Sequence, residues 1–254
     1  MAARIGARGI LSCAYLVALL VSGCSPLTQT GPNSLPPLRT YEAVVTDSGP
    51  HLLEVDDPVE GFNRGTYRFN YYFDEYLFRP VVRVYEILLP DFVKDRVSDA
   101  LDNIGEFGNL TNNLLQTKFM DAGITVSRVI INSTVGIAGL WDPAAEWGLP
   151  RKPADFGQTL GRYGVGSGAY IVLPALGPSN VRDTTGLAVD AAAFSLIGPI
   201  AWVNESAVSG AYTGIGTLDK RHRIPFRYHQ TGSPFEYELL RMLYTIKREF
   251  DVAN

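Results

Sequence analysis

The chain has 254 residues, of which 46% are apolar and 19% charged, with a net charge of −4. Because an acidic chain gains no affinity for nucleic acid from counterion release, composition argues against a nucleic-acid-binding protein. The two cysteines are Cys13 and Cys24, and Cys13 lies in an apolar leader that is expected to be removed, so the mature chain has no internal disulfide.

Residues 1–23 have the order of a secretory signal peptide. Residues 1–9 carry two arginines and no acid, and residues 10–21 are an apolar run that is too short to span a membrane comfortably. The run ends in Val21-Ser22-Gly23-Cys24, which resembles the lipobox of bacterial lipoproteins. That resemblance implies cleavage between Gly23 and Cys24 and a covalent diacylglycerol and N-acyl chain on Cys24. The alternative is an ordinary signal peptide with a chance cysteine.

Residues 24–56 are expected to form a flexible, lipidated tether. They contain five prolines and little periodic apolar pattern. Residue 25 is serine, whereas many lipoproteins retained at the inner membrane carry aspartate there. Similarity to other lipoproteins therefore predicts a lipid anchor on the periplasmic side of the outer membrane.

Residues 57–254 are expected to form one all-α domain. Asp57-Pro58 is typical of a helix start, Pro80 and Pro90 bracket a second helix, and a third begins at Asp91. Further helices are expected over 110–120, 122–138, 181–197, 203–218 and 234–250, with Tyr170–Leu173 as the best strand candidate. The glycine-rich run 161–168 indicates a loop with positive φ. After the leader, 18 consecutive apolar residues do not occur, so a conventional transmembrane helix is not expected.

Catalytic and metal-binding patterns are missing. Ser167 lacks the outer glycines of the hydrolase motif G-x-S-x-G, and the glycine run lacks the Gly-Lys-Ser/Thr ending of a phosphate loop. His51, His222 and His229 have no acid-rich ligand cluster beside them. The sequence therefore predicts neither an enzyme, nor a metal site, nor a bound cofactor other than the acyl chains.

Four stretches in order resemble the VacJ/MlaA family of outer-membrane phospholipid-trafficking lipoproteins. They are Asp57–Arg64 with Phe69-Asn70, Asn113–Gln116, Asn132–Asp142, and several strings between Asp155 and Asp183. The resemblance covers about residues 57–186 and returns weakly over Tyr237–Phe250. One departure is Ala169, where the family usually has proline.

The resemblance implies a ring- or disc-like helical domain embedded in one leaflet, with an amphipathic channel. Such a protein removes misplaced phospholipids from the outer leaflet and passes them to a soluble periplasmic carrier for retrograde transport, which maintains lipid asymmetry. An inner-membrane ATP-driven complex receives the lipid, and an outer-membrane porin trimer is the usual partner. The alternative is a non-transporting scaffold that docks porins or carrier proteins.

Candidate channel or motif residues come from the same strings. A phospholipid conduit needs polar groups for the headgroup among apolar walls, and arginine suits phosphate through its planar fork. The residues are Phe62, Asn63, Arg64, Asn113, Asn132 and Asp183. For Asn63 and Arg64 the alternative is capping or pairing within the helices, and for the asparagines it is satisfaction of buried backbone groups.

Overall fold

The computed structural model describes residues 55–203, 206–230 and 234–254. The chain divides into two units, Met1–Pro50 and His51–Asn254, and all of the described residues belong to the second. The expected signal peptide and the lipidation site, Gly23 and Cys24, lie outside the described residues, as does nearly all of the tether. The boundaries 1–23, 24–56 and 57–254 therefore stay predictions.

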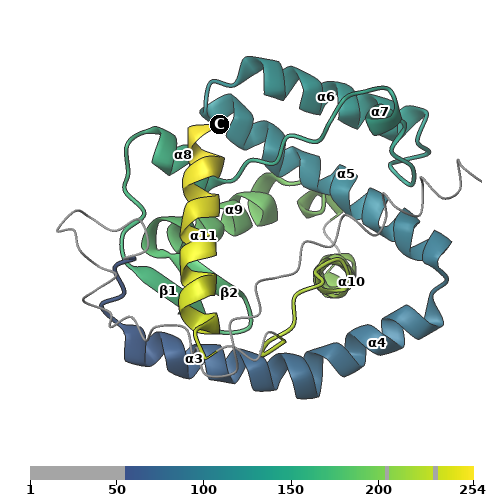
Figure 1. The fold of residues 1–254 in the computed structure, drawn as a ribbon. Helices are drawn as coiled ribbons and strands as arrows, with labels where there is room; N and C mark the ends of the chain where they lie inside the picture. Colours follow the sequence, from purple (N-terminus) through teal and green to yellow (C-terminus); the bar gives the residue numbers. More distant parts are fainter. Residues whose placement is uncertain (1–54, 204–205, 231–233) are drawn as a thin grey trace, which may run out of the picture. The chain divides into compact units, whose positions relative to one another are not determined.

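Helices dominate the second unit (Figure 1). The first part consists of α3 (Glu60–Phe73), the π-helical turn η1 (Asp74–Phe78), α4 (Arg79–Leu88), α5 (Asp91–Leu115), α6 (Phe119–Thr134), α7 (Pro143–Glu146) and α8 (Phe156–Arg162). The rest consists of β1 (Tyr170–Leu173), β2 (Gly177–Asn180), α9 (Val181–Ile197), the 3₁₀ turn η2 (Ala201–Val203), α10 (Ser206–His222) and α11 (Glu236–Ala253).

Side-chain caps set the starts of three helices. Asp142, Asp155 and Asn180 cap α7, α8 and α9, each accepting a hydrogen bond from a backbone N–H three residues on. The expected helix between Pro80 and Pro90, the start at Asp91 and the helix over 181–197 are confirmed. The boundary expected near residue 121 is wrong: α5 ends at Leu115 because Thr117 takes a left-handed φ of 58°.

A two-stranded hairpin corrects the expectation of an all-α domain. Strands β1 and β2 are antiparallel, with Tyr170 opposite Asn180 and Leu173 opposite Gly177. The strand expected over Tyr170–Leu173 is confirmed, and the turn that follows it contains Ala175 at a φ of 62°. This hairpin is the one sheet in the described residues, so the domain is mostly helical and not all-α.

Two asparagines of α3 hold the hairpin by its backbone. Asn63 Nδ2 donates to the Tyr170 carbonyl (3.0 Å), and Asn70 Nδ2 donates to the Leu173 carbonyl (3.0 Å). Their spacing of seven helical residues is about 10.5 Å, and three residues of strand span about 10 Å. The two rises match, so one helix face grips both ends of β1.

The packed core is small and aromatic. Tyr67, Tyr170, Val172 and Tyr237 are buried together where α3, the hairpin and α11 meet. The rings of Tyr67 and Tyr237 meet edge to face with centroids 5.8 Å apart. This cluster packs α3 against the β-hairpin and α11. The longer helices are outside it and are held by other contacts.

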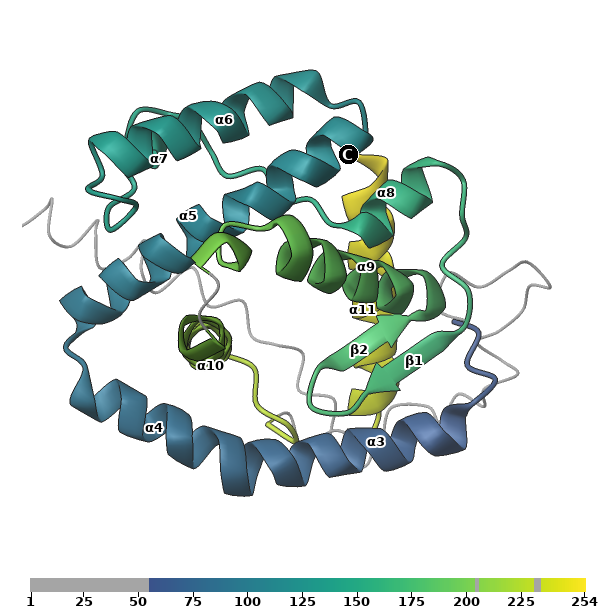
Figure 2. The same ribbon diagram turned by 180° about the vertical axis from the view of Figure 1, so that it is seen from behind.

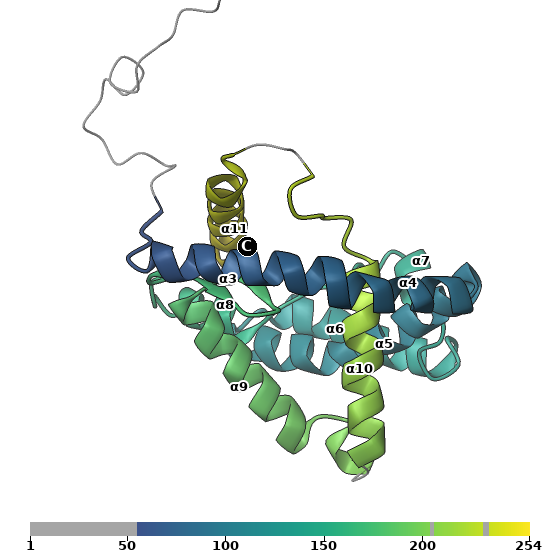
Figure 3. The ribbon, with the colours of Figure 1, turned by 90° about the horizontal axis from the view of Figure 1, so that it is seen from below.

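The long helices surround α10. From front and back, α4, α5 and α9 lie around α10, which is seen along its axis (Figures 1 and 2). Seen from below, α9 and α10 extend to one side of the α3–α4 line and converge toward η2, whereas α11 lies on the other side (Figure 3). We call the α9–η2–α10 segment, residues 181–222, the helical hairpin.

Candidate functional site

The distribution of polar and apolar side chains is inverted relative to a water-soluble domain. Among the described residues, 8 hydrophobic side chains are buried, whereas 21 polar or charged ones are. In the same residues, 40 large hydrophobic side chains are exposed. Water-soluble monomers seldom expose contiguous apolar patches of more than a few hundred Å². The outer surface therefore suits an apolar surrounding.

The exposed apolar side chains lie on whole helix faces. On α4, Val82 and Tyr85 face inward, whereas Val81, Val84 and Ile87 face outward, and Ile87 is 75% exposed. Corresponding faces run along the other long helices and the end of the helical hairpin. Examples are Phe69, Tyr76, Leu77, Leu88, Phe92, Phe119, Met120, Ile130, Leu196, Ile197, Trp202 and Val203.

The helical hairpin contains the most apolar stretch. Within the described residues, Val181–Val203 alone is long and apolar enough to cross a membrane by length and composition; its most apolar 18 residues have a mean hydropathy of 1.6, and 11% of them are buried. This stretch is not one straight helix, because α9 ends at Ile197 and Gly198-Pro199 separates it from η2. Leu196 and Trp202 are 77% and 75% exposed at its far end.

A buried charge network joins α5, α6 and the residues on either side of α7. Arg128 Nε donates to Glu106 Oε1 (2.8 Å), its Nη2 donates to Asp142 Oδ2 (2.8 Å), and its Nη1 donates to the Leu149 carbonyl (2.7 Å). Glu106 is fully buried and Arg128 is 2% exposed. Burial alone would raise the pKa of Asp142, but the bonds from Arg128 and Asn132 lower it. Polar contacts thus hold α5 and α6 together here, whereas apolar packing joins helices in most domains.

A second network joins α8, α9 and α11. Arg248 donates through Nε to Asp183 Oδ2 (2.7 Å) and through both Nη atoms to Asp155 (2.7 and 2.9 Å). Tyr244 also donates to Asp183 Oδ2 (2.9 Å). Burial alone would raise the pKa of Asp183, but the bonds from Arg248 and Arg182 lower it to about 2. The base of α9 is therefore held rigidly while its far end projects.

Four of the candidate channel residues are buried and bonded within the fold. Asn63 bonds the backbone of β1 and accepts from the Val172 N–H (2.8 Å). Asn113 donates to the Lys152 carbonyl (3.1 Å), and Asn132 donates to Asp142 Oδ1 (2.9 Å). Together with Asp183, they satisfy buried groups, which is the structural alternative given for the asparagines.

Phe62 and Arg64 lie at the surface of α3. Phe62 is exposed and lines a shallow apolar hollow with Gly65, Phe69 and Pro174. Arg64 pairs with Glu60 on its own helix and with Glu238 on α11. Its guanidinium also lies 4.4 Å from the centre of the Tyr237 ring. These contacts pair Arg64 with α11 rather than leaving it free for phosphate.

An amphipathic cavity of about 270 Å³ lies between α5 and α9. Its polar wall includes Asn112 and Asp190, and its apolar wall includes Phe107 and Phe194. Asp190 accepts hydrogen bonds from Asn112 Nδ2 and the Phe156 N–H, both 2.8 Å. Burial raises the pKa of Asp190, opposed by these two bonds. A Cβ added at Gly108 would meet no atom within 4 Å, so the glycine leaves this cavity open.

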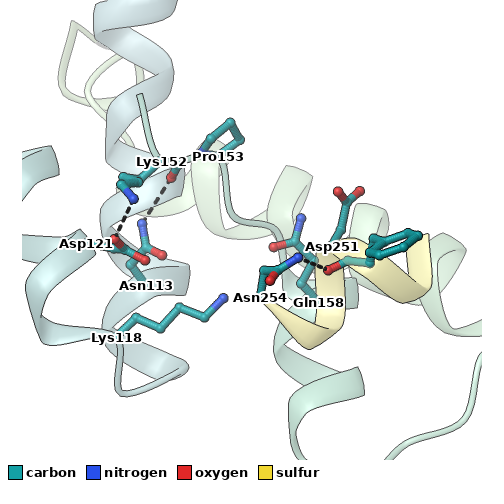
Figure 4. Close-up of a pocket in the computed structure, with 9 residues that line it drawn as sticks. Asn113, Lys118, Asp121, Lys152, Pro153, Gln158, Asp251 and Asn254 are labelled. Atoms are coloured by element: carbon teal, nitrogen blue, oxygen red, sulfur yellow. Dashed lines mark hydrogen bonds and ion pairs between the residues drawn. The ribbon is translucent and has the colours of Figure 1, made fainter. Parts of the chain in front are cut away.

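A smaller polar pocket of about 200 Å³ lies at the α5–α6 junction and the end of α11 (Figure 4). Lys152 Nζ lies 3.1 Å from Asp121 Oδ1, and the Asn113 amide bonds the Lys152 carbonyl. Burial lowers the pKa of Lys118, which lies beside this pair. Most polar groups here bond one another, and the lining is mainly polar, so this pocket lacks an apolar wall for acyl chains.

The residues that sequence reasoning did not select are Gly108, Asp190 and Phe194. One signal was visible, because Asp190 interrupts the most apolar stretch of the mature chain. An acid in such a position is costly unless it is hydrogen-bonded or functional. The neighbours that satisfy Asp190 come from α5 and α8, and the spacing of residues within α9 does not indicate them.

Comparisons with known proteins agree with this architecture. The family model described as MlaA lipoprotein matches residues 55–251. A protein of Rickettsia prowazekii is 39% identical over 148 residues, and the match spans 58% of either chain; a Rickettsia felis protein is 41% identical, with 53% of its length matched. The matched region thus covers little more than half of these relatives.

Two relatives match over a longer part of the chain. The intermembrane phospholipid transport system lipoprotein MlaA of Shigella flexneri is 32% identical over 204 residues, and that of Escherichia coli is 31% identical over 205; both matches cover 78% of either chain. A solved structure, described as the structural basis for maintenance of bacterial outer membrane lipid asymmetry, superposes with a TM-score of 0.64 and 27% identity. That match covers 78% of this chain and 99% of the other.

Proposed function

The chain belongs to the MlaA lipoprotein family, and from this premise we propose that it moves phospholipid out of the bacterial outer membrane. It removes misplaced phospholipids from the outer leaflet and passes them to a soluble periplasmic carrier, which maintains lipid asymmetry. The family is one of transport lipoproteins, so the chain is not an enzyme. An outer-membrane porin trimer as neighbour belongs to the same proposal.

The single observation that supports this proposal best is the inverted surface. With 40 large hydrophobic side chains exposed and 21 polar ones buried among the described residues, the domain is suited to sit in hydrocarbon rather than in water. Buried ion pairs take the place of an apolar core. Burying apolar side chains against one another stabilises a fold little when lipid already surrounds them. Embedding in the membrane is therefore part of the proposed function.

The length of the helical hairpin supports embedding in one leaflet. From Leu187 to Ile197, α9 is apolar except for Asp190 and Ser195, and it is largely exposed. These eleven residues rise about 16 Å, close to half of the ~30 Å hydrocarbon core. The break at Gly198 and Pro199 then turns the chain back into α10. A hairpin of this depth reaches the middle of the bilayer and does not cross it.

The cavity between α5 and α9 is the proposed section of the lipid path. It offers Asn112 and Asp190 on one wall and Phe107 and Phe194 on the other, which suits a molecule with a polar head and apolar tails. Placing polar groups inside a membrane-embedded protein costs free energy, and such groups commonly line substrate pathways. A route that is polar on one wall lets the headgroup pass without full dehydration.

A blocking substitution tests the path. Gly108→Phe places a ring in the cavity without a backbone clash, because a Cβ at this position meets no atom within 4 Å. Gly123→Phe on α6 is the matched control, since its Cβ also meets nothing and Gly123 lines none of the cavities described. Each variant replaces the wild-type gene, and outer-leaflet phosphatidylethanolamine is labelled with a membrane-impermeant amine reagent.

Gly108→Phe should raise the labelled phospholipid and the sensitivity to detergent to the level of a gene deletion. Gly123→Phe should leave both at the wild-type level, and both variants should retain wild-type protein abundance and porin co-purification. Full complementation by Gly108→Phe would refute this path. A defect found only together with lost porin binding would favour the scaffold alternative.

A further inference from the structure

The largest cavity described, about 730 Å³, is a groove outside the proposed lipid path. It lies between α4 and residues 221–227, which comprise the end of α10 and the segment after it. Its polar lining comprises Glu75, Arg79, Arg83, Glu86, Arg221, His222 and Arg227. Val82, Ile224 and Phe226 add an apolar wall. The groove is thus both basic and amphipathic.

Most charges in this groove already have partners. Arg79 pairs with Glu75, and His222 Nδ1 lies 2.7 Å from Glu86 Oε1. Arg221 binds both carboxylate oxygens of Asp74, at 2.8 and 2.9 Å, and this pairing raises the pKa of Arg221. Each acid that lines the groove is therefore matched by a base that also lines it.

Arg83 and Arg227 are the surplus. Neither has a carboxylate within ion-pair distance among the described residues, and both are exposed. Two guanidinium groups in one concavity leave it with positive charge that the protein itself does not neutralise. A planar guanidinium fork binds phosphate oxygens in pairs.

Arg221 builds the far wall of the groove. Its Nη1 donates to the Ile224 carbonyl (2.8 Å), and its Nη2 donates to the Phe226 carbonyl (3.0 Å). These bonds fold residues 222–227 back beside α4, and Arg227 follows directly. The groove is consequently a preformed feature rather than a gap between loose segments.

The height of the groove decides which anion it would meet. The groove borders the C-terminal end of α10, and η2 with its apolar tip precedes the other end (Figure 3). The 17 residues of α10 rise about 25 Å, whereas headgroups begin about 15 Å from the bilayer middle and end near 22 Å. With the tip at the middle of the bilayer, an upright α10 would end just outside the headgroups, and any tilt of α10 brings that end closer to the middle, so this placement puts the groove at or next to headgroup level.

We propose that this groove binds the phosphodiester headgroup of a net-anionic phospholipid. Arg83 and Arg227 hold the phosphate, and Val82, Ile224 and Phe226 contact the glycerol and the first acyl carbons. Its volume falls within the range of small-ligand sites, about 300–1,000 Å³, and a concave site of this size fits a headgroup better than a flat protein surface. The inference rests on the membrane embedding proposed above.

The test uses the full, acylated protein in an uncharged detergent. The probes are dihexanoyl phosphatidylglycerol and dihexanoyl phosphatidylethanolamine, both kept monomeric, and inorganic phosphate. The variant is Arg83→Gln with Arg227→Gln. The matched control is Arg68→Gln with Arg162→Gln, which removes the same charge from two exposed arginines that line none of the cavities described.

The wild type should bind phosphatidylglycerol more tightly than phosphatidylethanolamine. The groove variant should weaken phosphatidylglycerol binding about tenfold or more, weaken phosphatidylethanolamine binding less because that lipid has no net charge, and the control should keep wild-type affinity. Equal weakening in the control, or an unchanged groove variant, would overturn the proposal. Displacement of phosphatidylglycerol by equimolar inorganic phosphate would do the same, since the site would then select free phosphate.

The two proposals fail in different ways. If Gly108→Phe abolishes lipid removal in cells but the groove variant binds phosphatidylglycerol like the wild type, only the headgroup site is refuted. If the wild type carries no phospholipid and Gly108→Phe has no effect, the conduit itself is refuted.

Discussion

The Asn63 side chain and the Tyr170 backbone lie 107 residues apart in sequence and are joined by a hydrogen bond of 3.0 Å. Asn63 also accepts from the Val172 N–H (2.8 Å) and donates to Asp57 Oδ1 (2.7 Å). One fully buried carboxamide therefore joins the segment before α3 to strand β1. In a domain with few buried apolar side chains, such contacts are the main restraint on tertiary structure.

Replacing Asn63 should cost more stability than a typical surface change. Asn63→Ala leaves the Val172 N–H and the Tyr170 carbonyl without their side-chain partner in a buried place, which is expected to cost about 2–3 kcal/mol. Denaturant unfolding of the detergent-solubilised protein, followed by circular dichroism, measures this loss. Asn254→Ala at the exposed C-terminus should change stability by less than about 0.5 kcal/mol. Equal losses of stability in the two variants would contradict a structural role for the Asn63 hydrogen bonds.

The buried Arg128–Glu106 pair should show strong coupling. Arg128→Met leaves the fully buried Glu106 without its main partner, at an expected cost of about 3–5 kcal/mol. The double variant Arg128→Met with Glu106→Gln should be more stable than Arg128→Met alone, because the unpaired charge is gone. The same unfolding assay measures both. Additive losses would show that the two side chains do not depend on each other.

Acid should weaken the attachment of α9 through Asp183. The pKa of Asp183 is lowered from 3.8 to about 2 in the folded protein, so its ionised form stabilises folding. This contribution is complete above the unfolded pKa and is lost as pH falls from about 4 toward 2. The stability difference between wild type and Asp183→Asn should therefore be constant above about pH 5 and shrink below pH 4. A difference independent of pH would contradict this.

The end of the helical hairpin should lie near the middle of the bilayer. With Trp141 and Trp147 replaced by phenylalanine, Trp202 is the remaining tryptophan, and lipids brominated deep in the acyl chains should quench its fluorescence most strongly. Leu196→Asp should reduce that quenching, because a central aspartate costs about 3 kcal/mol of insertion. Leu239→Asp, on α11, should not. Strongest quenching by shallow bromines would disprove the proposed depth.

The anchor makes a separate prediction. Cys24→Ala removes the thiol that receives diacylglycerol, so the signal peptide should remain uncleaved and the protein should accumulate as a precursor. Intact-mass measurement of the membrane fraction distinguishes this precursor from the triacylated mature chain. A Ser25→Ala variant should be processed normally. Normal cleavage of Cys24→Ala would instead support the ordinary signal peptide.

Local order in the sequence determined the family and some of the helix boundaries. The strings between Asp57 and Asp183 predicted the MlaA family, which the comparisons confirm. Pro80, Pro90 and the cap Asn180 act on neighbouring residues, so their effects are readable from spacing alone. The left-handed Thr117, which moved one boundary, has no comparable local signal.

The tertiary structure decided which side of each helix is covered. Apolar periodicity in α4 shows that a face is apolar, and it does not say whether protein or lipid covers that face. Likewise the asparagines at 63, 113 and 132 are equally compatible with a wet channel and with buried backbone until their partners are known. Those partners lie on other elements. A contact between residues 107 positions apart, such as Asn63 and Tyr170, leaves no local pattern in the sequence. Burial and hydrogen bonding are properties of the assembled fold, so the structure alone assigned them.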